Sequence, residues 1–489
     1  MLEELLKVKK DDKDLSDPKQ SIISSSKGKT SRILPFVMEY FEDYVLSNGN
    51  FYKHNGKFYE LQTKENVAKK ICNFFIDNGI FDYWNETKEK ELLKMLVYTD
   101  AIPEKELDCD DDYLNMNNGV LNARTHEFEP HDKKFGFTYC LDANYNKDAK
   151  NCPHFLTFLS GLFAVSGDWE KGYKTDKAMV ENIIMLCGYI LYPVIKINGM
   201  FFFIGSGSNG KSILVKIIQM FFPKKFTSVL SLSAISKEDS NNRVDLINSK
   251  LNISAEEKDG AINVEELKKI TYGEEILISR KYLDPIKIKA KTKILCCTNN
   301  MPYFNDTSHG TKRRLLFFDF PNKFVSEKKY KLESFPDQRR IFVGRDEDEM
   351  LDEIKEEKEA ILNLFIEGLK MLKKNKWQFH ETPAMEKIKE EYDANSDVFG
   401  VWLKENYEVS NSEFDFIATS IVYNDFMDFY NSTNGKKSIH SINYVGKRIK
   451  ELFRIDAVKT SVRDGCDVKT VRGFNIKKKE HQEIKNLMA

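Results

Sequence analysis

The sequence has no long apolar run and no pattern of paired cysteines. No window approaches the roughly 20 apolar residues that a membrane-spanning helix needs, and the charged start, MLEELLKVKKDDKDLSD, does not resemble a secretory signal. The eight cysteines, at 72, 109, 140, 152, 187, 296, 297 and 466, include no C-x-x-C pair and no zinc-type spacing with histidines. These absences argue against a membrane protein and a disulfide-stabilised secreted domain, so we expect a cytoplasmic protein with reduced thiols.

Net charge is also nearly absent, at −1 over 489 residues, but the charge is unevenly distributed. Residues 436–479 contain 13 Lys and Arg against four acidic residues, which predicts an anionic partner for this segment. The length suggests about three domains, and a hydrophobic fraction of 41% is enough for ordinary packed cores.

The clearest pattern is a phosphate loop at the middle of the chain. It follows a short apolar run, Phe201–Ile204, that is typical of a buried parallel strand. The loop consists of Gly205, Ser206, Gly207, Ser208, Asn209, Gly210, Lys211 and Ser212. Its glycines allow successive backbone N–H groups to surround a triphosphate, while Lys211 reaches the outer phosphates and the Ser212 hydroxyl holds Mg²⁺. A chance Gly/Ser-rich turn is the alternative, but the preceding strand and the amphipathic helix expected after the loop argue against it.

Two later apolar strands end in polar residues suited to nucleotide hydrolysis. Residues 250–255 lead into Glu256 and Glu257, of which one would hold Mg²⁺ and the other would orient the attacking water. A surface glutamate pair is the alternative, which the upstream phosphate loop makes less attractive. Residues 293–298 lead into Asn299, whose amide can contact the γ-phosphate or the lytic water.

Residues 276–289, which lie between these strands, read as two β arms around a short tip. The tip carries Arg280, Lys281 and Tyr282. A cation beside an aromatic ring suits DNA phosphates and stacked bases, although an isolated hairpin of this kind is more often only a solvated turn.

Two arginines, Arg313 and Arg314, precede a further apolar strand at 315–320. An arginine can stabilise charge on a leaving phosphate. These side chains cannot easily reach the phosphate loop of their own chain, but in a ring they could reach the loop of a neighbour.

The chain divides by composition into five segments. We predict a flexible tail (1–34), a small α/β domain (35–175), the ATPase motor (176–345), a helical connector (346–394) and a basic C-terminal domain (395–489). Within the second segment, the acidic run 108–112 is expected to be a solvated loop rather than a metal site. A zinc site from His126, His131, Cys152 and His154 fits no standard spacing.

The C-terminal domain shows three helical runs (398–403, 421–430 and 442–452) followed by two β stretches (457–462 and 468–476). With Lys447 and Arg448 on the last helix, this order favours a winged-helix DNA-binding domain. A basic structural or oligomerisation domain is the alternative.

Taken in order, these motifs resemble those of superfamily 3 helicases, most of all the poxvirus-type and phage/plasmid primase-helicase branch, over roughly residues 50 to 480. The resemblance implies an α/β fold: an AAA+ type P-loop core with an N-terminal helicase-associated α/β domain and a C-terminal winged helix. It implies ATP and Mg²⁺ as cofactors. It also assigns roles to individual residues: Lys211 and Ser212 for nucleotide, Glu256 and Glu257 as the acids, Asn299 as sensor, Arg314 in preference to Arg313 as the arginine acting on a neighbour, and Lys281 with Tyr282 as the DNA-tracking tip.

The expected function is therefore ATP-dependent unwinding of DNA by a ring, expected to be a hexamer, which also serves as a replication initiator. Single-stranded and forked DNA, origin DNA and a separate primase or other replication proteins are the expected partners, and no membrane is involved. A nucleotide-switched DNA-binding regulator without unwinding and a small-molecule P-loop kinase remain the alternatives. The Glu256-Glu257 pair leaves open which acid orients water.

Overall fold

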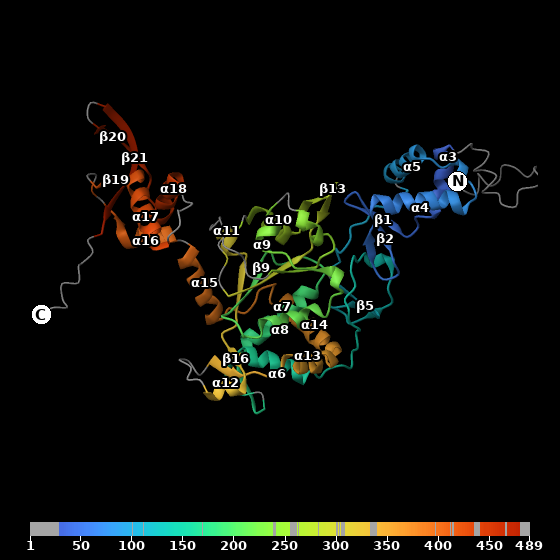
Figure 1. Cartoon of the computed structure of the whole chain (residues 1–489), viewed down its shortest axis with the longest axis horizontal. Coiled ribbons are helices and arrows are strands. Elements are labelled where there is room, and N and C mark those ends of the chain that lie inside the picture. The colour runs from blue at the N-terminus through green and yellow to red at the C-terminus, as the bar shows by residue number, and fades with distance from the viewer. Residues whose placement is uncertain are drawn as a thin grey trace, which may run out of the picture. The chain divides into compact units, whose positions relative to one another are not determined.

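The computed structural model describes residues 29–479 except 100, 111, 169, 238–240, 255–261, 263, 282, 300–301, 303, 305–308, 333–339, 397, 411, 413–414, 435–440 and 465–466. Its contacts form two units, the first ending at Glu386 and the second beginning at Lys387 (Figure 1). Among the described helices, none combines the length and the apolar character needed to cross a lipid bilayer.

The first unit centres on a five-stranded parallel sheet with the order β10-β11-β14-β9-β15. Its strands are β9 (Met200–Ile204), β10 (Thr227–Ser228), β11 (Leu251–Ser254), β14 (Lys293–Thr298) and β15 (Leu315–Asp319). The apolar runs predicted as strands around 201–204, 250–255, 293–298 and 315–320 are therefore confirmed. The edge strand β10 was not predicted, because two residues are too short to show a period.

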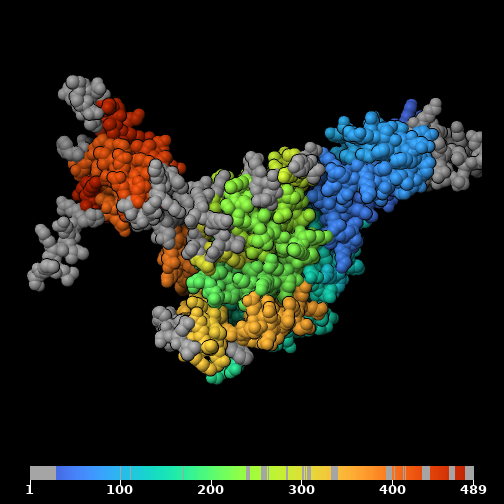
Figure 2. Space-filling view, in the orientation of Figure 1, coloured from blue at the N-terminus to red at the C-terminus, as the bar shows by residue number. Residues whose placement is uncertain are grey.

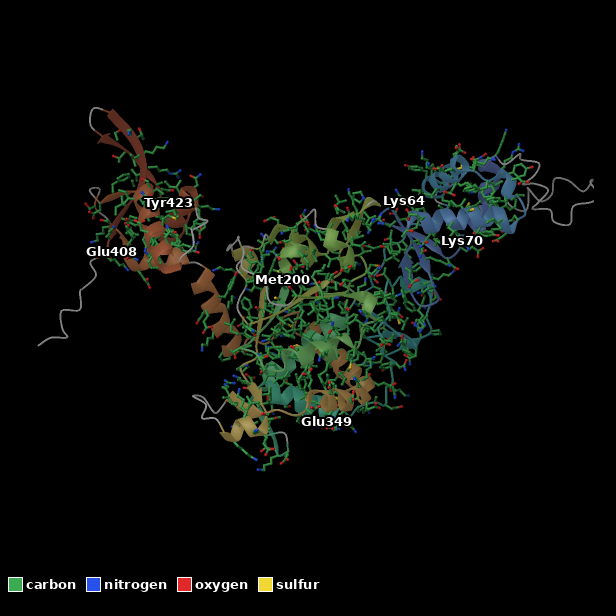
Figure 3. All side chains as sticks on the ribbon, viewed as in Figure 1. Lys64, Lys70, Met200, Glu349, Glu408 and Tyr423 are labelled. Carbon is green, nitrogen blue, oxygen red and sulfur yellow. The ribbon has the colours of Figure 1, made fainter. Side chains whose placement is uncertain are left out.

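The phosphate-loop strand β9 lies between β14 and β15, with Thr298 of β14 opposite Ile204. Phe201, Phe202 and Phe203 are fully buried, as expected for a strand covered on both faces. Figure 3 shows Met200, the first residue of β9, among the side chains of the first unit. Because the five strands of this sheet are all parallel, their carboxyl ends meet at one edge of the sheet.

The first unit also contains helices from both sides of the loop in sequence. They are α6 (Pro153–Leu162), α7 (Lys177–Leu191), α8 (Lys211–Gln219), α9 (Leu232–Ile235), α10 (Val264–Tyr272), α11 (His309–Lys312), α12 (Glu327–Leu332), α13 (Glu347–Glu356) and α14 (Lys358–Lys374). Short pairs add to them: β7 (Ala164–Asp168) with β8 (Gly172–Thr175), β12 (Glu275–Arg280) with β13 (Leu283–Lys289), and β16 (Lys323–Val325) with β17 (Ile341–Val343). In Figure 2 the orange surface of α13 and α14 lies against the green and teal surface of the preceding part of the unit. The predicted connector helices thus share the core of the sheet.

Two glycines allow α14 to approach α7 closely. A Cβ on Gly368 of α14 would lie 2.3 Å from the Ile184 carbonyl oxygen, and a Cβ on Gly188 of α7 would lie 2.1 Å from the Phe365 carbonyl oxygen. Both distances are shorter than any real Cβ contact, so the two helix backbones touch at positions where no side chain fits.

We expect Gly368→Ala to destabilise the first unit by about 1–3 kcal/mol or more, because the methyl group meets backbone atoms that cannot rotate away. In the interior of an exposed helix the same glycine-to-alanine change would instead stabilise the helix by roughly 1 kcal/mol. The midpoint of thermal unfolding measures the effect. Gly446→Ala is the matched control, since its Cβ would meet only Thr419 Cγ2, at 3.3 Å. An unchanged midpoint for Gly368→Ala would show that the helices are not this close.

The segment before α6 contains two separate packed regions. The elements of the first are α3 (Thr30–Glu39), β1 (Tyr44–Ser47), β2 (Asn50–His54), β3 (Tyr59–Leu61), α4 (Lys64–Asp77), η1 (Phe81–Tyr83) and α5 (Glu86–Tyr98). The helices α3, α4 and α5 share their own core with β1 and β2, and α3 begins inside the predicted tail. The second region has β4 (Tyr113–Met116), β5 (Gly119–Asn122), β6 (Phe128–Glu129) and η2 (Lys133–Phe135), and it shares the core of the parallel sheet.

A buried ion pair joins this second region to the sheet. Asp108 is 3% exposed and accepts from Lys250 Nζ at 2.8 Å, from Thr138 Oγ1 at 2.5 Å and from the Thr138 N–H at 2.7 Å. Lys291 Nζ donates to the Asp108 carbonyl oxygen at 2.5 Å, and Lys293 is also buried. The prediction of a solvated loop at 108–112 was therefore wrong for Asp108, since its lysine partners come from just before the distant strands β11 and β14.

Lys250, Lys291 and Lys293 form what we call the lysine cluster, at the amino ends of β11 and β14. Burial first, and then repulsion from Lys250, lowers the pKa of Lys293 from 10.5 to about 7. Its Nζ donates to the Tyr192 carbonyl oxygen, and the Tyr189 ring centroid lies 5.3 Å away. Lys293 therefore loses its proton in the folded protein more readily than in the unfolded chain.

This difference predicts a pH-dependent stability. Between pH 7 and 10.5 the unfolded state holds the Lys293 proton more tightly, so the free energy of unfolding rises with pH across that window. We expect Lys293→Met to remove this rise, measured as the urea midpoint at pH 7 and pH 9. Lys289→Met is the control, because Lys289 is 39% exposed and paired with Glu106 on the surface. An equal rise in wild type and Lys293→Met would contradict the prediction.

The second unit packs around its own core. Helix α15 (Pro383–Ser396) crosses the boundary between the units, and the elements that follow are α16 (Val398–Asn406), β18 (Tyr407–Val409), β19 (Phe416–Ala418), α17 (Thr419–Asn434), α18 (Ile442–Phe453), β20 (Val458–Asp464) and β21 (Asp467–Lys478). The predicted three helices and two strands are confirmed. In addition, β18 and β19 both pair with β21.

Candidate nucleotide-binding site

The phosphate loop adopts a conformation that depends on its glycines. Gly207 and Gly210 have φ of +93° and +80°, in the left-handed region that glycine tolerates. A Cβ on Gly210 would also lie 2.4 Å from Leu162 of α6, and a Cβ on Gly205 would lie 2.1 Å from the Asn209 side chain. Asn209 is buried and donates to the Phe320 carbonyl oxygen at 3.4 Å. The loop is therefore held between α6 and the end of β15.

Helix α8 begins at Lys211, so the loop ends at a helix N-terminus, where backbone N–H groups favour a phosphate. Lys211 is 7% exposed, and its Nζ donates to the Gly205 carbonyl oxygen at 2.6 Å and to Asn299 Oδ1 at 3.3 Å. The ammonium group thus lies over the loop where outer phosphates would bind. Two residues predicted separately, Lys211 and Asn299, are brought together here because β14 neighbours β9 in the sheet.

The predicted acids, Glu256 and Glu257, lie outside the described residues. The strand that precedes them, β11, ends at Ser254 at the same edge of the sheet as the loop. Ser212, in the first turn of α8, is exposed and lines the cavity next to the loop. An exposed serine hydroxyl beside a phosphate loop is the kind of hard oxygen ligand that Mg²⁺ prefers, so the described part of the site fits this ion.

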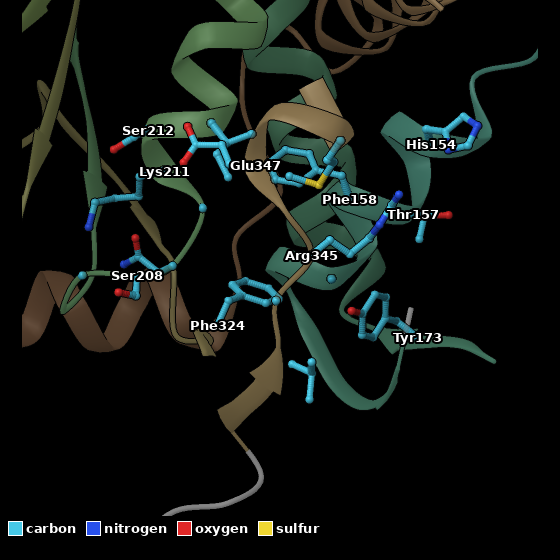
Figure 4. Close-up of a pocket in the computed structure, with 18 of the residues that line it drawn as sticks. His154, Thr157, Phe158, Tyr173, Ser208, Lys211, Ser212, Phe324, Arg345 and Glu347 are labelled. Atoms are coloured by element: carbon cyan, nitrogen blue, oxygen red, sulfur yellow. The ribbon is translucent and has the colours of Figure 1, made fainter. Parts of the chain in front are cut away.

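A cavity of about 520 Å³ opens from the loop. This is within the range of about 300–1,000 Å³ that is typical of small-molecule sites. Figure 4 shows Ser208, Lys211 and Ser212 at one end of the cavity and Thr157 and Tyr173 at the other. The cavity therefore extends well beyond the space that a triphosphate alone would fill.

Outside the loop itself, the cavity is lined by segments that precede and follow the loop in sequence. These lining residues are Thr157, Phe158, Tyr173, Phe324, Arg345 and Glu347. Sequence reasoning did not identify them, because they lie in four separate segments and follow no local motif. Only their proximity in the fold marks them as part of the site.

The predicted hairpin is present as β12 and β13, antiparallel, with Arg280 opposite Leu283. Ile276, Ile278 and Ile288 are buried on one face, whereas Lys281 is exposed at the turn. Tyr282 lies outside the described residues. The hairpin connects α10 to β14, and β14 ends at Thr298, immediately before Asn299 of the nucleotide site.

The two arginines before β15 have different surroundings. Arg314 is 8% exposed, donates to the Gly310 carbonyl oxygen and to Tyr272 Oη, and lies 4.8 Å from the centroid of the Tyr272 ring. Arg313 is exposed. Hydrogen bonding from Arg313, with a further contribution from Arg314, lowers the pKa of the Tyr272 phenol at the end of α10.

In the second unit, Lys447 and Arg448 lie on α18. The Lys447 side chain is 79% exposed, while that of Arg448 is 24% exposed and pairs with Glu451 at 3.0 Å. In the part of the chain that the structure describes, no group of three or more His, Cys, Asp or Glu side chains is arranged to hold a metal ion.

The sequence matches two families over separate segments. Residues 36–163 match the family described as D5 N terminal like, and residues 203–314, from the phosphate-loop strand to Arg314, match a family of unknown function, DUF5906.

Viral proteins named as helicases are distant relatives. The chain is 22% identical over 451 residues to "Putative helicase V13" of Sputnik virophage, covering 89% of this chain and 52% of the relative. It is 23% identical over 293 residues to "Putative helicase L207/L206" of Acanthamoeba polyphaga mimivirus, covering 57% and 28%. It is 22% identical over 400 residues to "Putative helicase 121R" of Invertebrate iridescent virus 3, covering 76% and 39%. The chain thus spans between about a quarter and a half of these relatives' lengths.

Among solved structures, the apo C-terminal region of NrS-1 is similar, with a TM-score of 0.40 and 12% identity over 89% of this chain and 96% of that one. In sequence, the chain combines a D5-like N-terminal segment with a phosphate-loop segment, and it is distantly similar to viral proteins that are named as helicases.

Proposed function

We propose that this chain is the motor of an ATP-dependent DNA helicase of superfamily 3, with an AAA+ type core, acting in DNA replication. It binds ATP with Mg²⁺ at the phosphate loop and works as a ring, expected to be a hexamer, on single-stranded and forked DNA. The proposal rests on one observation, the direct chain connection between the hairpin and the nucleotide site. Strand β14 begins just after the hairpin β12–β13 and ends just before Asn299, which accepts a hydrogen bond from Lys211.

This route gives hydrolysis a mechanical output. Loss of the γ-phosphate changes what Lys211 and Asn299 bind, and β14 connects that change to β12 and β13. Lys281 at the exposed turn is the group that grips a DNA phosphate, as its charge and position suit. Glu256 and Glu257 supply the acids: Glu256 with Ser212 would hold Mg²⁺, and the neighbouring glutamate would orient water.

A neighbouring subunit completes the proposed site with an arginine. The burial of Arg314 against Tyr272 in its own chain favours the exposed Arg313 as the side chain that reaches across. Arg314 then fixes the turn that presents Arg313. This reverses the preference that the motif resemblance gave.

The second unit is proposed to be a winged-helix-like domain that grips origin DNA. Its helices followed by the β20–β21 hairpin have the required order, and the exposed Lys447 on α18 suits a phosphate contact better than the paired Arg448.

Lys281→Ala tests the mechanism. We expect it to reduce unwinding of a forked duplex and DNA-stimulated ATP hydrolysis by about tenfold or more, because a phosphate contact at the tip is lost. Hydrolysis without DNA should change little, since Lys281 does not line the cavity beside the loop. Lys287→Ala, an exposed lysine on an arm of the same hairpin, is the matched control.

Each other result points to a different protein. If single-stranded DNA does not stimulate ATP turnover by the wild type, a small-molecule kinase is the better assignment. If the chain binds DNA but does not hydrolyse ATP, a nucleotide-switched DNA-binding regulator is the better assignment. If Lys281→Ala unwinds as well as Lys287→Ala, the hairpin is not the tracking element.

A further inference from the structure

The cavity beside the phosphate loop has an aromatic far end that the phosphates do not explain. Tyr173 of β8 and Arg345, which follows β17, line this end, whereas Phe158 of α6 and Phe324 of β16 line the cavity between it and the loop: a Cβ on Gly210 would lie 3.5 Å from the Phe158 ring, and the Phe324 N–H donates to the Ser208 carbonyl oxygen at 2.7 Å. In Figure 4 the Arg345 side chain lies between Phe158 and Tyr173, on the opposite side of the cavity from Lys211. Ring faces around an arginine are suited to a flat, uncharged ring system rather than to more phosphate.

The Arg345 guanidinium is held in place by a carboxylate. Its Nη2 donates to Glu353 Oε1 at 2.9 Å, and its Nη1 lies 2.9 Å from Glu353 Oε2. His154 Nδ1 lies 3.0 Å from the same Oε2 atom. The Arg345 side chain is only 23% exposed, so a two-point contact fixes the plane of the guanidinium at the cavity wall.

The elements that carry this wall are tied to the phosphate loop. Glu357, after α13, accepts from the backbone N–H groups of His154 and Phe155, each at 2.9 Å, and so joins α13 to the start of α6. Lys216 of α8 pairs with Glu347 of α13 at 2.5 Å. Leu162 at the end of α6 packs on Gly210 of the loop. These contacts fix the position of Arg345 relative to the phosphate loop.

We propose that this far end is the base-and-sugar half of the nucleotide site, and that a purine base stacks on the planar guanidinium of Arg345. The inference rests on the proposed function, because it takes a nucleoside triphosphate as the occupant. Because Glu353 neutralises the charge of Arg345, the guanidinium can stack on a base without also attracting the phosphates. A purine offers the larger stacking face, so purine nucleotides should bind more tightly than pyrimidine nucleotides.

The experiment compares ATP with inorganic tripolyphosphate, both with Mg²⁺, because tripolyphosphate has the phosphates but no base or sugar. We expect Arg345→Ala to weaken ATP binding about tenfold and to leave tripolyphosphate binding unchanged. Arg345→Lys can keep a charge beside Glu353 but lacks the plane, so it should behave like Arg345→Ala. Lys355→Ala, on an exposed part of α13, is the control.

A second comparison uses the bases themselves. In the wild type, ATP and GTP should bind more tightly than CTP and UTP, and Arg345→Ala should reduce that preference. Equal weakening of ATP and tripolyphosphate by Arg345→Ala, full rescue by Arg345→Lys, or no effect on ATP would each overturn the inference. Failure of the proposed function gives a different result: Lys211→Ala would then leave the binding of both ligands unchanged.

Discussion

Replacing Lys211 by alanine is expected to lower ATP hydrolysis by about two to three orders of magnitude. The Lys211 ammonium lies beside the Gly205 carbonyl and the Asn299 amide, 7% exposed, at the carboxyl edge of the sheet. In such a low-dielectric position one positive charge stabilises the developing charge of a transferred phosphoryl group far more than it would in water. Steady-state phosphate release measures the loss.

The control for this variant is Lys224→Ala. Lys224 is exposed and comes shortly after the end of α8, so its removal changes the same net charge without reaching the loop. The thermal midpoint of both variants must match the wild type within a few degrees for the comparison to hold. ATP hydrolysis by Lys211→Ala at more than about a tenth of the wild-type rate would contradict the assignment of this loop as the nucleotide site.

The parts of the site that could be predicted from the sequence are those whose residues all lie within one short segment. The phosphate loop, its flanking strand and helix, and the hairpin at 276–289 each follow from local period and local glycines. Asn299 could be placed as well, because the ends of parallel strands converge whatever their order.

The parts that could not be predicted depend on contacts between distant segments. Phe158, Tyr173 and Arg345 line the cavity from positions nearly 200 residues apart, and each alone looks like an ordinary core or surface residue. Arg314 belongs to the arginine pair before β15, but Tyr272 of α10 covers its side chain. Only the folded structure reveals this burial. Asp108 looked like one of several solvated acids because its partners lie about 140 residues later.

The network around Asp108 leads to the largest expected effect on stability. Burial would raise the pKa of the Asp108 carboxyl, but Lys250 and Lys291 outweigh it and hold the pKa below 3.8. The stabilisation is therefore present above pH 3.8 and is lost as the pH falls through the lower pKa of the folded state. At neutral pH this is the carboxylate that offsets the positive charge of the lysine cluster.

We expect Asp108→Asn to destabilise the first unit by about 3–5 kcal/mol at pH 7, because it leaves Lys250 buried without a counter-charge. Asparagine tolerates the φ of +50° at this position, so the backbone need not change. The urea midpoint at pH 7 measures the loss. Raising the pH toward 10 should recover part of it, as Lys291 and Lys293, whose pKa values burial lowers, give up their protons.

Asp112→Asn is the matched control from the same acidic run. Its carboxylate is 30% exposed and makes only long contacts, 3.6 Å to Arg124 and 4.0 Å to Lys373, so about 1 kcal/mol or less should be lost. If Asp108→Asn and Asp112→Asn lower the midpoint equally, Asp108 does not hold the lysine cluster. If Asp108→Asn shows no recovery at high pH, the damage comes from lost hydrogen bonds to Thr138 and not from unpaired charge.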